Sequence, residues 1–147
     1  MVWGGRIALD KLGIIPKKYF ASEIKPCAIK CATTNYNDII EIGDVTKIKY
    51  EDNKLYNADG NIVYEGHIDL LLFGSPCQDF SMANLQNKAK ENNNFASYGL
   101  NGLKSRLFYE ALRIKNECKP TYFLFENVKM KESSERLLNH YMGVKGL

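Results

Sequence analysis

Short apolar runs alternate with amphipathic segments along this chain. Brief runs rich in β-branched or aromatic residues predict strands, and apolar residues that recur every three or four positions predict helices. The predicted strands are 18–23, 39–42, 68–73 and 122–125. The predicted helices are 7–12, 25–32, 103–118 and 132–141, the first ending at Gly13 and the last at Gly143. This order favours an α/β fold built on a parallel, doubly wound sheet.

Two segments interrupt the alternation. Between 54 and 66, an Asp-Gly pair at 59–60 separates stretches that contain Tyr and Val, which predicts a β-hairpin. We interpret the hairpin as an insertion that carries no chemistry of its own. The segment 82–102 is rich in Asn, Lys, Ser and Gly and has no apolar period. It is predicted to be a long loop, and such loops often form active-site lids.

Composition sets outer bounds on what the chain can be. Its 147 residues suit one domain, and 45% hydrophobic with 25% charged residues is ordinary for a globular protein. The net charge of +3 is compatible with a polyanionic partner but does not by itself indicate DNA. No run approaches the roughly 18 apolar residues that cross a bilayer, and no leader pattern opens the chain. We therefore expect a cytoplasmic protein.

The four cysteines do not form a recognisable metal or redox motif. No two are spaced as Cys-x-x-Cys, so neither a zinc site nor a dithiol is expected. Cys27 and Cys31 fall on one face of a predicted helix. We interpret these two residues and Cys118 as buried and unreactive. The remaining cysteine, Cys77, lies in a polar motif that follows a predicted strand.

Two polar motifs follow two of the predicted strands. The sequence Gly-Ser-Pro-Cys-Gln at 74–78 comes directly after the strand 68–73, and Glu-Asn-Val at 126–128 follows the strand 122–125. In open α/β sheets the carboxyl ends of the strands border the ligand crevice. The pair of motifs therefore indicates a cysteine nucleophile with a carboxyl partner.

This pair resembles the catalytic signatures of the DNA cytosine-5 methyltransferases, a Pro-Cys-Gln loop followed by a Glu-Asn-Val strand end. Three more segments are similar to family motifs and occur in family order, at 19–24, 43–45 and 105–110. The resemblance covers essentially the whole chain. It implies a Rossmann-like sheet that uses S-adenosylmethionine as methyl donor and DNA as partner, with the target cytosine flipped out of the duplex.

The resemblance implies a catalytic role for four residues. Cys77 would add as thiolate to C6 of cytosine, and Pro76 would stiffen the loop before it. Glu126 would stabilise the charge that develops toward N3. Desolvation by the apolar residues before Glu126 would favour its protonated form. Asn127 would orient the loop around Cys77.

The resemblance also implies a cofactor pocket. Glu23 would accept both ribose hydroxyls, and Ile24 would lie against the adenine, which Asp44 and Val45 would hold at its edge and face. One further residue matches the end of the loop that cradles the methionine, and another starts a helix near the cofactor. The implied cofactor-binding residues are Gly5, Glu23, Ile24, Asp44, Val45 and Leu107.

Several family features have no counterpart in this sequence. The family opens with a strand ending in Asp-x-Phe-x-Gly-x-Gly, and after the last predicted helix it continues to a target-recognition region. We therefore expect a partial catalytic domain over 1–147, with an incomplete sheet. An inactive remnant, a binding module for DNA or cofactor, and one part of a split enzyme with a complementing chain stay open as alternatives. Methylation of RNA is also left open.

Overall fold

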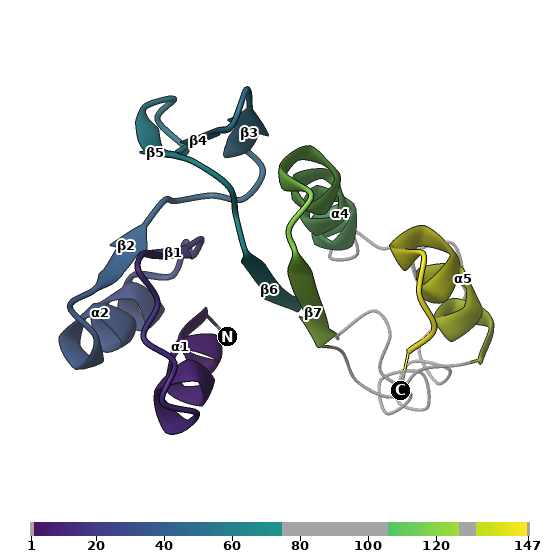
Figure 1. Cartoon of the computed structure of the whole chain (residues 1–147), viewed down its shortest axis with the longest axis horizontal. Helices are drawn as coiled ribbons and strands as arrows, with labels where there is room; N and C mark the ends of the chain where they lie inside the picture. The colour runs from purple at the N-terminus through teal and green to yellow at the C-terminus, as the bar shows by residue number, and fades with distance from the viewer. Residues whose placement is uncertain (1, 75–105, 127–131, 147) are drawn as a thin grey trace, which may run out of the picture. The chain divides into compact units, whose positions relative to one another are not determined.

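A computed structural model of the chain describes residues 2–74, 106–126 and 132–146. The helices are α1 (Val2–Lys11), α2 (Pro26–Asn35), α4 (Arg106–Cys118) and α5 (Glu132–Met142). The strands are β1 (Tyr19–Ala21), β2 (Ile39–Glu41), β3 (Lys49–Glu51), β4 (Lys54–Tyr56), β5 (Ile62–Glu65), β6 (Leu70–Gly74) and β7 (Tyr122–Glu126), and Figure 1 labels them. The chain forms two compact units, Met1–Leu72 with Glu117–Phe123, and Phe73–Asn116 with Leu124–Leu147.

The first unit contains a parallel strand pair covered by a helix. β1 and β2 run side by side (Figure 1). Their parallel register places Tyr19 opposite Ile39 and Ala21 opposite Glu41. Side chains two apart on a strand share a face, and here Ala21 and Ile39 are buried against Ala32 of α2. This small core fixes the end of the strand pair at which Glu23 and Asp44 follow.

Helix α1 is held to the same unit by a buried cation. Arg6 is only 8% exposed, and its Nη2 lies 3.0 Å from Oδ2 of Asp38. Its guanidinium also lies over the ring of Tyr36, 4.6 Å from the centroid. One residue earlier, a Cβ on Gly5 would collide with Cδ1 of Leu72 and lie 2.9 Å from the hydroxyl of Tyr19. Gly5 is therefore a position at which α1 packs too closely for a larger side chain.

A three-stranded antiparallel sheet, β3-β4-β5, completes the first unit. The hairpin predicted at 54–66 forms as β4 and β5, and Gly60 takes a positive φ of 82° in its turn. The sequence reading missed β3, whose turn into β4 has positive φ at Asp52 and Asn53. Asn favours that backbone region more than most residues do, so Asp-Asn was the available signal. That the hairpin is an insertion stays a prediction.

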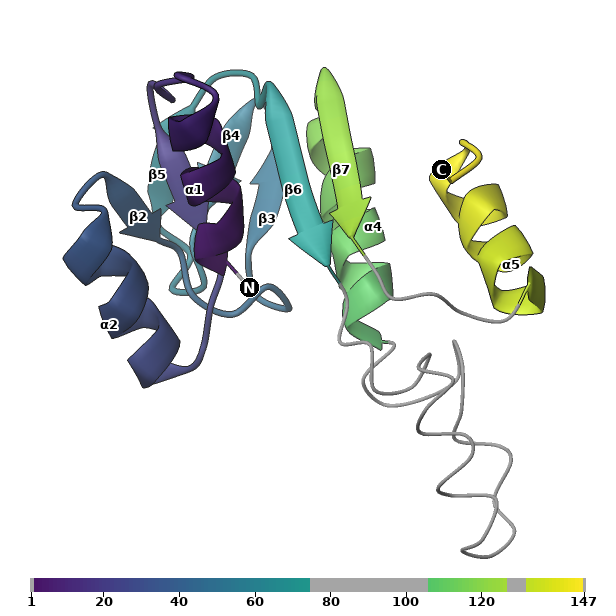
Figure 2. The same cartoon turned by 90° about the horizontal axis from the view of Figure 1, so that it is seen from below.

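Strands β6 and β7 form another two-stranded sheet and run in the same direction (Figure 2). The amide of Tyr122 donates to the carbonyl of Asp69 at 2.8 Å, where the pair begins. In the second unit Phe108 of α4 is fully buried and packs against Phe125 and Tyr141, with ring centroids 5.5 and 6.3 Å away. The aromatic core therefore anchors the carboxyl end of β7.

The predicted elements form in the predicted order, with α1 starting five residues earlier than expected because helical geometry extends back to Val2. The mixture of helices and small sheets is consistent with the predicted α/β class. Among the described residues, β1-β2 and β6-β7 are separate strand pairs. The described residues before β1 form helix α1, so they supply no strand to join the two pairs. That the sheet is incomplete for the family stays a prediction.

Burial was predicted for three cysteines, and the structure confirms it for only one of them. Cys118 is buried, as predicted, at 5% exposure. The prediction for Cys27 and Cys31 is wrong, since both thiols are exposed on α2. Ala32 is the buried residue of that helix, and a position next to it in sequence is turned about 100° away. The strand-facing stripe of α2 is therefore too narrow to include the two cysteines.

Candidate cofactor and catalytic site

The carboxylate of Glu23 is fixed by its own loop at the end of β1. Its Oε1 accepts hydrogen bonds from the amides of Ile24 at 2.9 Å and Lys25 at 3.1 Å. The loop is tied to the end of β2, because the hydroxyl of Ser22 donates to the carbonyl of Gly43 at 2.6 Å. The structure thus joins the two segments that the sequence assigned to ribose and adenine.

Asp44 is also preorganised. Its Oδ1 accepts hydrogen bonds from the amide and the hydroxyl of Thr46, both at 2.9 Å. These two donors lower the pKa of Asp44. The preceding Gly43 has a φ of 85°, and a Cβ there would lie 2.7 Å from Cβ of Ala58. A glycine at this point lets the turn carrying Asp44 pass close to the hairpin sheet.

Sequence reasoning missed a third carboxyl at this end of the strand pair. Glu41 is the last residue of β2, and both of its carboxyl oxygens are buried without a hydrogen-bond partner in the described residues. Burial raises the pKa of Glu41, and the nearby charge of Glu23 raises it further. The available signal was an acidic residue between Ile40 and Ile42 in an otherwise apolar strand.

The other predicted cofactor residues take varied positions. Ile24 is 67% exposed beside Glu23, which leaves its side chain free to cover a flat ring. Val45 follows Asp44 and is partly buried. Gly5 lies inside α1 rather than in a loop. Leu107 belongs to the second unit, in the first turn of α4, and is 37% exposed. Their roles toward a cofactor stay predictions.

The ends of β6 and β7 meet in the second unit. A Cβ built on Gly74 would lie 3.0 Å from the carbonyl oxygen of Glu126 and 3.1 Å from its Oε2. Stacked aromatic rings also pack at these strand ends, since the ring centroids of Phe73 and Phe125 are 5.0 Å apart. The carboxyl of Glu126 therefore lies over the residue that leads into the Ser-Pro-Cys-Gln sequence.

The expected desolvation of Glu126 is wrong for the described residues. Glu126 is exposed, and the neighbouring Leu124 is 62% exposed. Side chains alternate along β7, so Phe123 and Phe125 turn inward while Leu124 and Glu126 turn outward. Pro76, Cys77 and Asn127, and the predicted loop at 82–102, lie outside the described residues.

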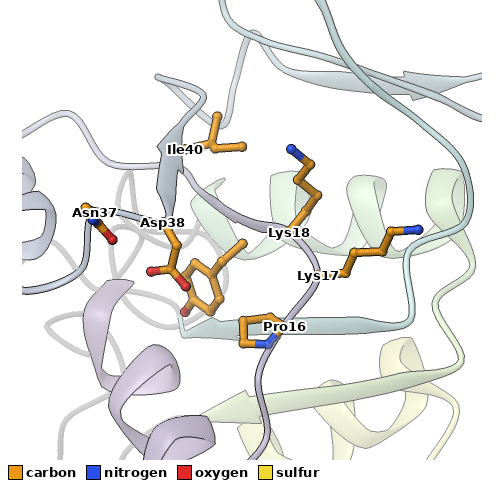
Figure 3. Close-up of a pocket in the computed structure, with 7 residues that line it drawn as sticks. Pro16, Lys17, Lys18, Asn37, Asp38 and Ile40 are labelled. Atoms are coloured by element: carbon orange, nitrogen blue, oxygen red, sulfur yellow. The ribbon is translucent and has the colours of Figure 1, made fainter.

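A hollow of about 280 Å³ lies at the opposite end of the β1-β2 pair. Residues before the two strands line it, including Lys17, Lys18 and Asp38 (Figure 3). Figure 3 shows the two lysine side chains extending away from Asp38, whose carboxylate is already paired with Arg6. Because Glu23 and Asp44 follow the carboxyl ends of the strands, this hollow is distinct from the candidate cofactor residues.

Within the described ranges there is no cluster of three or more His, Cys, Asp or Glu residues able to hold a metal ion. Likewise, none of the helices described is both long and apolar enough to span a membrane. At each of the two strand-pair ends, considered separately, the polar side chains are instead carboxyls that can form hydrogen bonds. Such groups suit recognition of hydroxyl and amino donors, and stabilisation of charge on a heterocycle.

The chain is similar to known proteins over most of its length. Residues 2–142 match the family described as C-5 cytosine-specific DNA methylase. The type II methyltransferase M.NlaIV of Neisseria lactamica is 33% identical over 122 residues, which make up 83% of this chain and 23% of that protein. The orphan methyltransferase M.Rho11sI of Bacillus phage rho11s is 33% identical over 138 residues, 92% of this chain and 22% of that protein.

A third relative, the type II methyltransferase M1.ScrFI of Lactococcus lactis subsp. cremoris, is 33% identical over 120 residues, 82% of this chain and 25% of that protein. This chain thus spans about a quarter of the length of the relatives it matches. The family match, in contrast, runs through almost all of the chain and includes both strand-pair ends. The protein belongs to the C-5 cytosine-specific DNA methylase family.

Proposed function

We propose that this chain supplies the cofactor-binding and catalytic part of a DNA cytosine-5 methyltransferase. The observation that carries the proposal is the close approach of Gly74 and Glu126 at the ends of β6 and β7, where a Cβ on Gly74 would lie 3.1 Å from Oε2 of Glu126. Cys77 follows Gly74 by three residues, a chain length of at most about 11 Å. A thiol and a carboxyl within that reach of one another can act on two atoms of one pyrimidine ring.

Cys77 is proposed as the nucleophile. C5 of cytosine is a poor nucleophile, and addition of a thiolate to C6 turns the ring into an enamine-like species that is reactive at C5. A free thiol with a pKa of about 8.5 is only slightly ionised at neutral pH, so attack requires loss of the thiol proton. Pro76 is proposed to stiffen the loop and Asn127 to orient it by hydrogen bonding.

Glu126 is proposed to assist the same step from the other side of the base. Addition at C6 builds negative charge toward N3, and a carboxyl that donates a hydrogen bond there lowers the barrier. Glu126 is exposed in this structure. The flipped base itself would exclude water from this carboxyl when it enters the site.

S-adenosylmethionine is the proposed methyl donor, since it supplies an electrophilic methyl group for C5. The residues at the end of the β1-β2 pair fit its adenosine part. Glu23 and Asp44 are fixed acceptors held by amide and hydroxyl donors, and Ile24 is an exposed apolar side chain beside them. Val45, Gly5 and Leu107 complete the proposed set of cofactor residues.

DNA is the proposed partner, with the target cytosine rotated out of the duplex at a cost of a few kcal/mol. The relatives include two named type II methyltransferases and one named an orphan methyltransferase. A restriction–modification setting is therefore one proposal and a solitary enzyme another. Sequence recognition, by further chain or by a complementing polypeptide, and the incomplete sheet are part of the same proposal.

The test is methyl transfer from labelled S-adenosylmethionine to mixed-sequence DNA by the purified chain. Cys77→Ser should abolish label in cytosine and covalent capture of a C5-blocked cytosine analogue. Cys31→Ser is the matched control, because Cys31 is an exposed thiol far along the sequence from both motifs. Equal losses from both substitutions would contradict the nucleophile assignment.

The same experiment separates catalysis from simple binding. Retention of DNA or S-adenosylmethionine by a folded chain, with no label transferred at any protein concentration, would support a binding module or an inactive remnant instead. Restoration of label by an added polypeptide that is inactive alone would support a split enzyme. Label in RNA but not in DNA would move the substrate to RNA cytosine.

A further inference from the structure

The turn that follows β2 is held from two sides. Its first residue, Ile42, is buried, and the carbonyl of Ile42 accepts a hydrogen bond from the amide of Ala58 in the hairpin at 2.9 Å. The next carbonyl, that of Gly43, accepts from the hydroxyl of Ser22 at 2.6 Å. Buried carbonyls need a donor from the protein, and here two separate segments supply one each. Asp44 is the residue that comes next.

The hairpin donor is fixed by a closed turn between β4 and β5. Oδ1 of Asn57 accepts from the amides of Asp59 at 3.1 Å and Asn61 at 2.9 Å. Asn side chains that bond the backbone two residues further on stabilise turns in this way. Ala58 lies within the turn, so its amide is presented by a rigid local structure. The hairpin is predicted from sequence to carry no chemistry, yet it holds the turn that follows β2.

Contacts before and after Asp44 leave this residue little freedom. Before it, Gly43 has a φ of 85°, and a Cβ there would lie 2.7 Å from Cβ of Ala58, closer than packed carbon atoms come. After it, the amide and the hydroxyl of Thr46 both donate to Oδ1 of Asp44 at 2.9 Å. The position of the carboxylate therefore depends on the turn before it, which Ser22 and the hairpin hold.

We propose that Ser22 and the hairpin turn at 57–61 form a brace that positions Asp44, and that this brace sets the preference of the cofactor site for adenine over hypoxanthine. The inference rests on the proposed function, because it takes Asp44 as the acceptor at the edge of the adenine. A carboxylate accepts from the 6-amino group of adenine but repels the carbonyl oxygen that hypoxanthine has there. Such discrimination requires an acceptor held in one place. Ser22 and the hairpin turn are positioning groups and need no contact with the ligand.

The test compares binding of S-adenosylhomocysteine, which has no methyl group to donate, with binding of S-inosylhomocysteine, its hypoxanthine counterpart. Isothermal titration calorimetry on the full chain gives the ratio of the two affinities. Ser22→Ala removes the hydroxyl that holds Gly43 and should lower the preference for adenine by about twofold to tenfold, the range for one neutral hydrogen bond. Ser22→Thr keeps the hydroxyl and should restore most of the preference. Asn57→Ala opens the hairpin turn and should lower the same ratio.

Two controls make the result specific. Thr33→Ala removes a hydroxyl that also donates to a backbone carbonyl, that of Ile29 at 3.0 Å, on an exposed part of α2 in the same unit. This variant should leave the ratio unchanged. In a chain that already carries Asp44→Asn, Ser22→Ala should have no further effect on the ratio, because the brace acts only through Asp44. A purely structural role for Ser22 would weaken both ligands alike, with or without Asp44→Asn.

The outcomes distinguish this inference from the proposed function. If wild type prefers S-adenosylhomocysteine and neither Ser22→Ala nor Asn57→Ala changes the ratio, the inference is overturned and the cofactor assignment stands. Equal affinity of wild type for the two ligands, or equal weakening of both by the variants, also overturns it. If circular dichroism shows that Ser22→Ala does not fold, the ratio in Asn57→Ala decides. If folded wild type binds neither ligand, the cofactor assignment itself fails and the inference fails with it.

Discussion

The two strand pairs of this protein end in different ways. At the end of β1-β2 the chain has already placed its carboxyls: Glu23 accepts two amides and Asp44 accepts an amide and a hydroxyl. At the end of β6-β7 a single carboxyl, Glu126, is exposed over Gly74. Fixed acceptors suit a ligand that must be held in one orientation. An accessible carboxyl suits a substrate that brings its own shielding when it enters.

A close-packed glycine lies at each of these ends, and the two have different neighbours. Gly43 has positive φ and approaches the Cβ of Ala58, so it serves the backbone path of the turn. Gly74 approaches the carbonyl and Oε2 of Glu126, so it serves the position of a functional group. The comparison predicts that changes at the first end act through folding or binding, and changes at the second through catalysis.

Among the described residues, the largest effect is expected at Glu126. Glu126→Gln keeps the shape of the side chain but removes its acidic proton, and the rate of methyl transfer should fall by about 10² to 10⁴. Stability should stay within about 0.5 kcal/mol of wild type, because the side chain is exposed. Single-turnover transfer and urea unfolding measure the two quantities. Full activity in this variant would remove Glu126 from the mechanism.

The next effect is expected at Gly74. In Gly74→Ala the new Cβ would lie 3.0 Å from one oxygen of Glu126 and 3.1 Å from another, so the Glu126 carboxyl must shift by a few tenths of an ångström. Misplacement of a reacting group by about 1 Å can lower a rate a hundredfold, so a loss of about tenfold is expected here. The same transfer assay measures it. A tenfold drop in cofactor affinity with normal turnover would contradict this placement.

The free energy of unfolding should distinguish the packing of two glycines, Gly43 and Gly60, that both have positive φ. Gly43→Ala meets the Cβ of Ala58, whereas Gly60→Ala has open space, although φ is positive at both positions. Gly60→Ala should therefore destabilise by about 1 kcal/mol, the cost of a left-handed residue. Gly43→Ala should add about 1 to 3 kcal/mol of overpacking. Chemical denaturation measures both, and equal losses would show that the contact with Ala58 is soft.

The smallest effects are changes in the pH dependence of stability. The lowered pKa of Asp44 contributes stability above the unfolded value of about 3.9 that is lost as pH falls through the lower folded value. Asp44→Asn should therefore be destabilising at neutral pH and lose that effect in acid. Thermal midpoints between pH 2 and 7 measure it.

Glu41 should show the opposite sign. Its raised pKa makes the protonated form the favoured one in the folded state, so its contribution is present below the unfolded value of about 4.3 and lost as pH rises through the folded value. Glu41→Gln should match wild type in acid and gain stability relative to it toward neutral pH. Thermal midpoints over the same pH range test this. Parallel plots of midpoint against pH for wild type and Glu41→Gln would show that Glu41 is solvated.

Much of the local structure could be predicted from sequence because its signals are local. Gly13 and Gly143 have φ of 70° and 72° at the helix ends where they were expected, and the Asp-Gly pair lies in a hairpin turn. Burial could not be predicted as well. Cys27 and Cys31 are exposed because a helix covers only a short strand pair, and the width of that cover depends on residues far along the chain.

The sequence by itself determined the family, the order of the elements and the residues that carry the proposed chemistry, because these depend on residue type and spacing. Tertiary structure decided which carboxyls are paired, buried or open. Glu23, Glu41 and Glu126 are the same amino acid near strand ends, yet one accepts two amides, one is buried without a donor, and one is exposed. Their different states follow from neighbours brought close by folding, because desolvation and hydrogen bonding act over a few ångströms of space rather than along the chain.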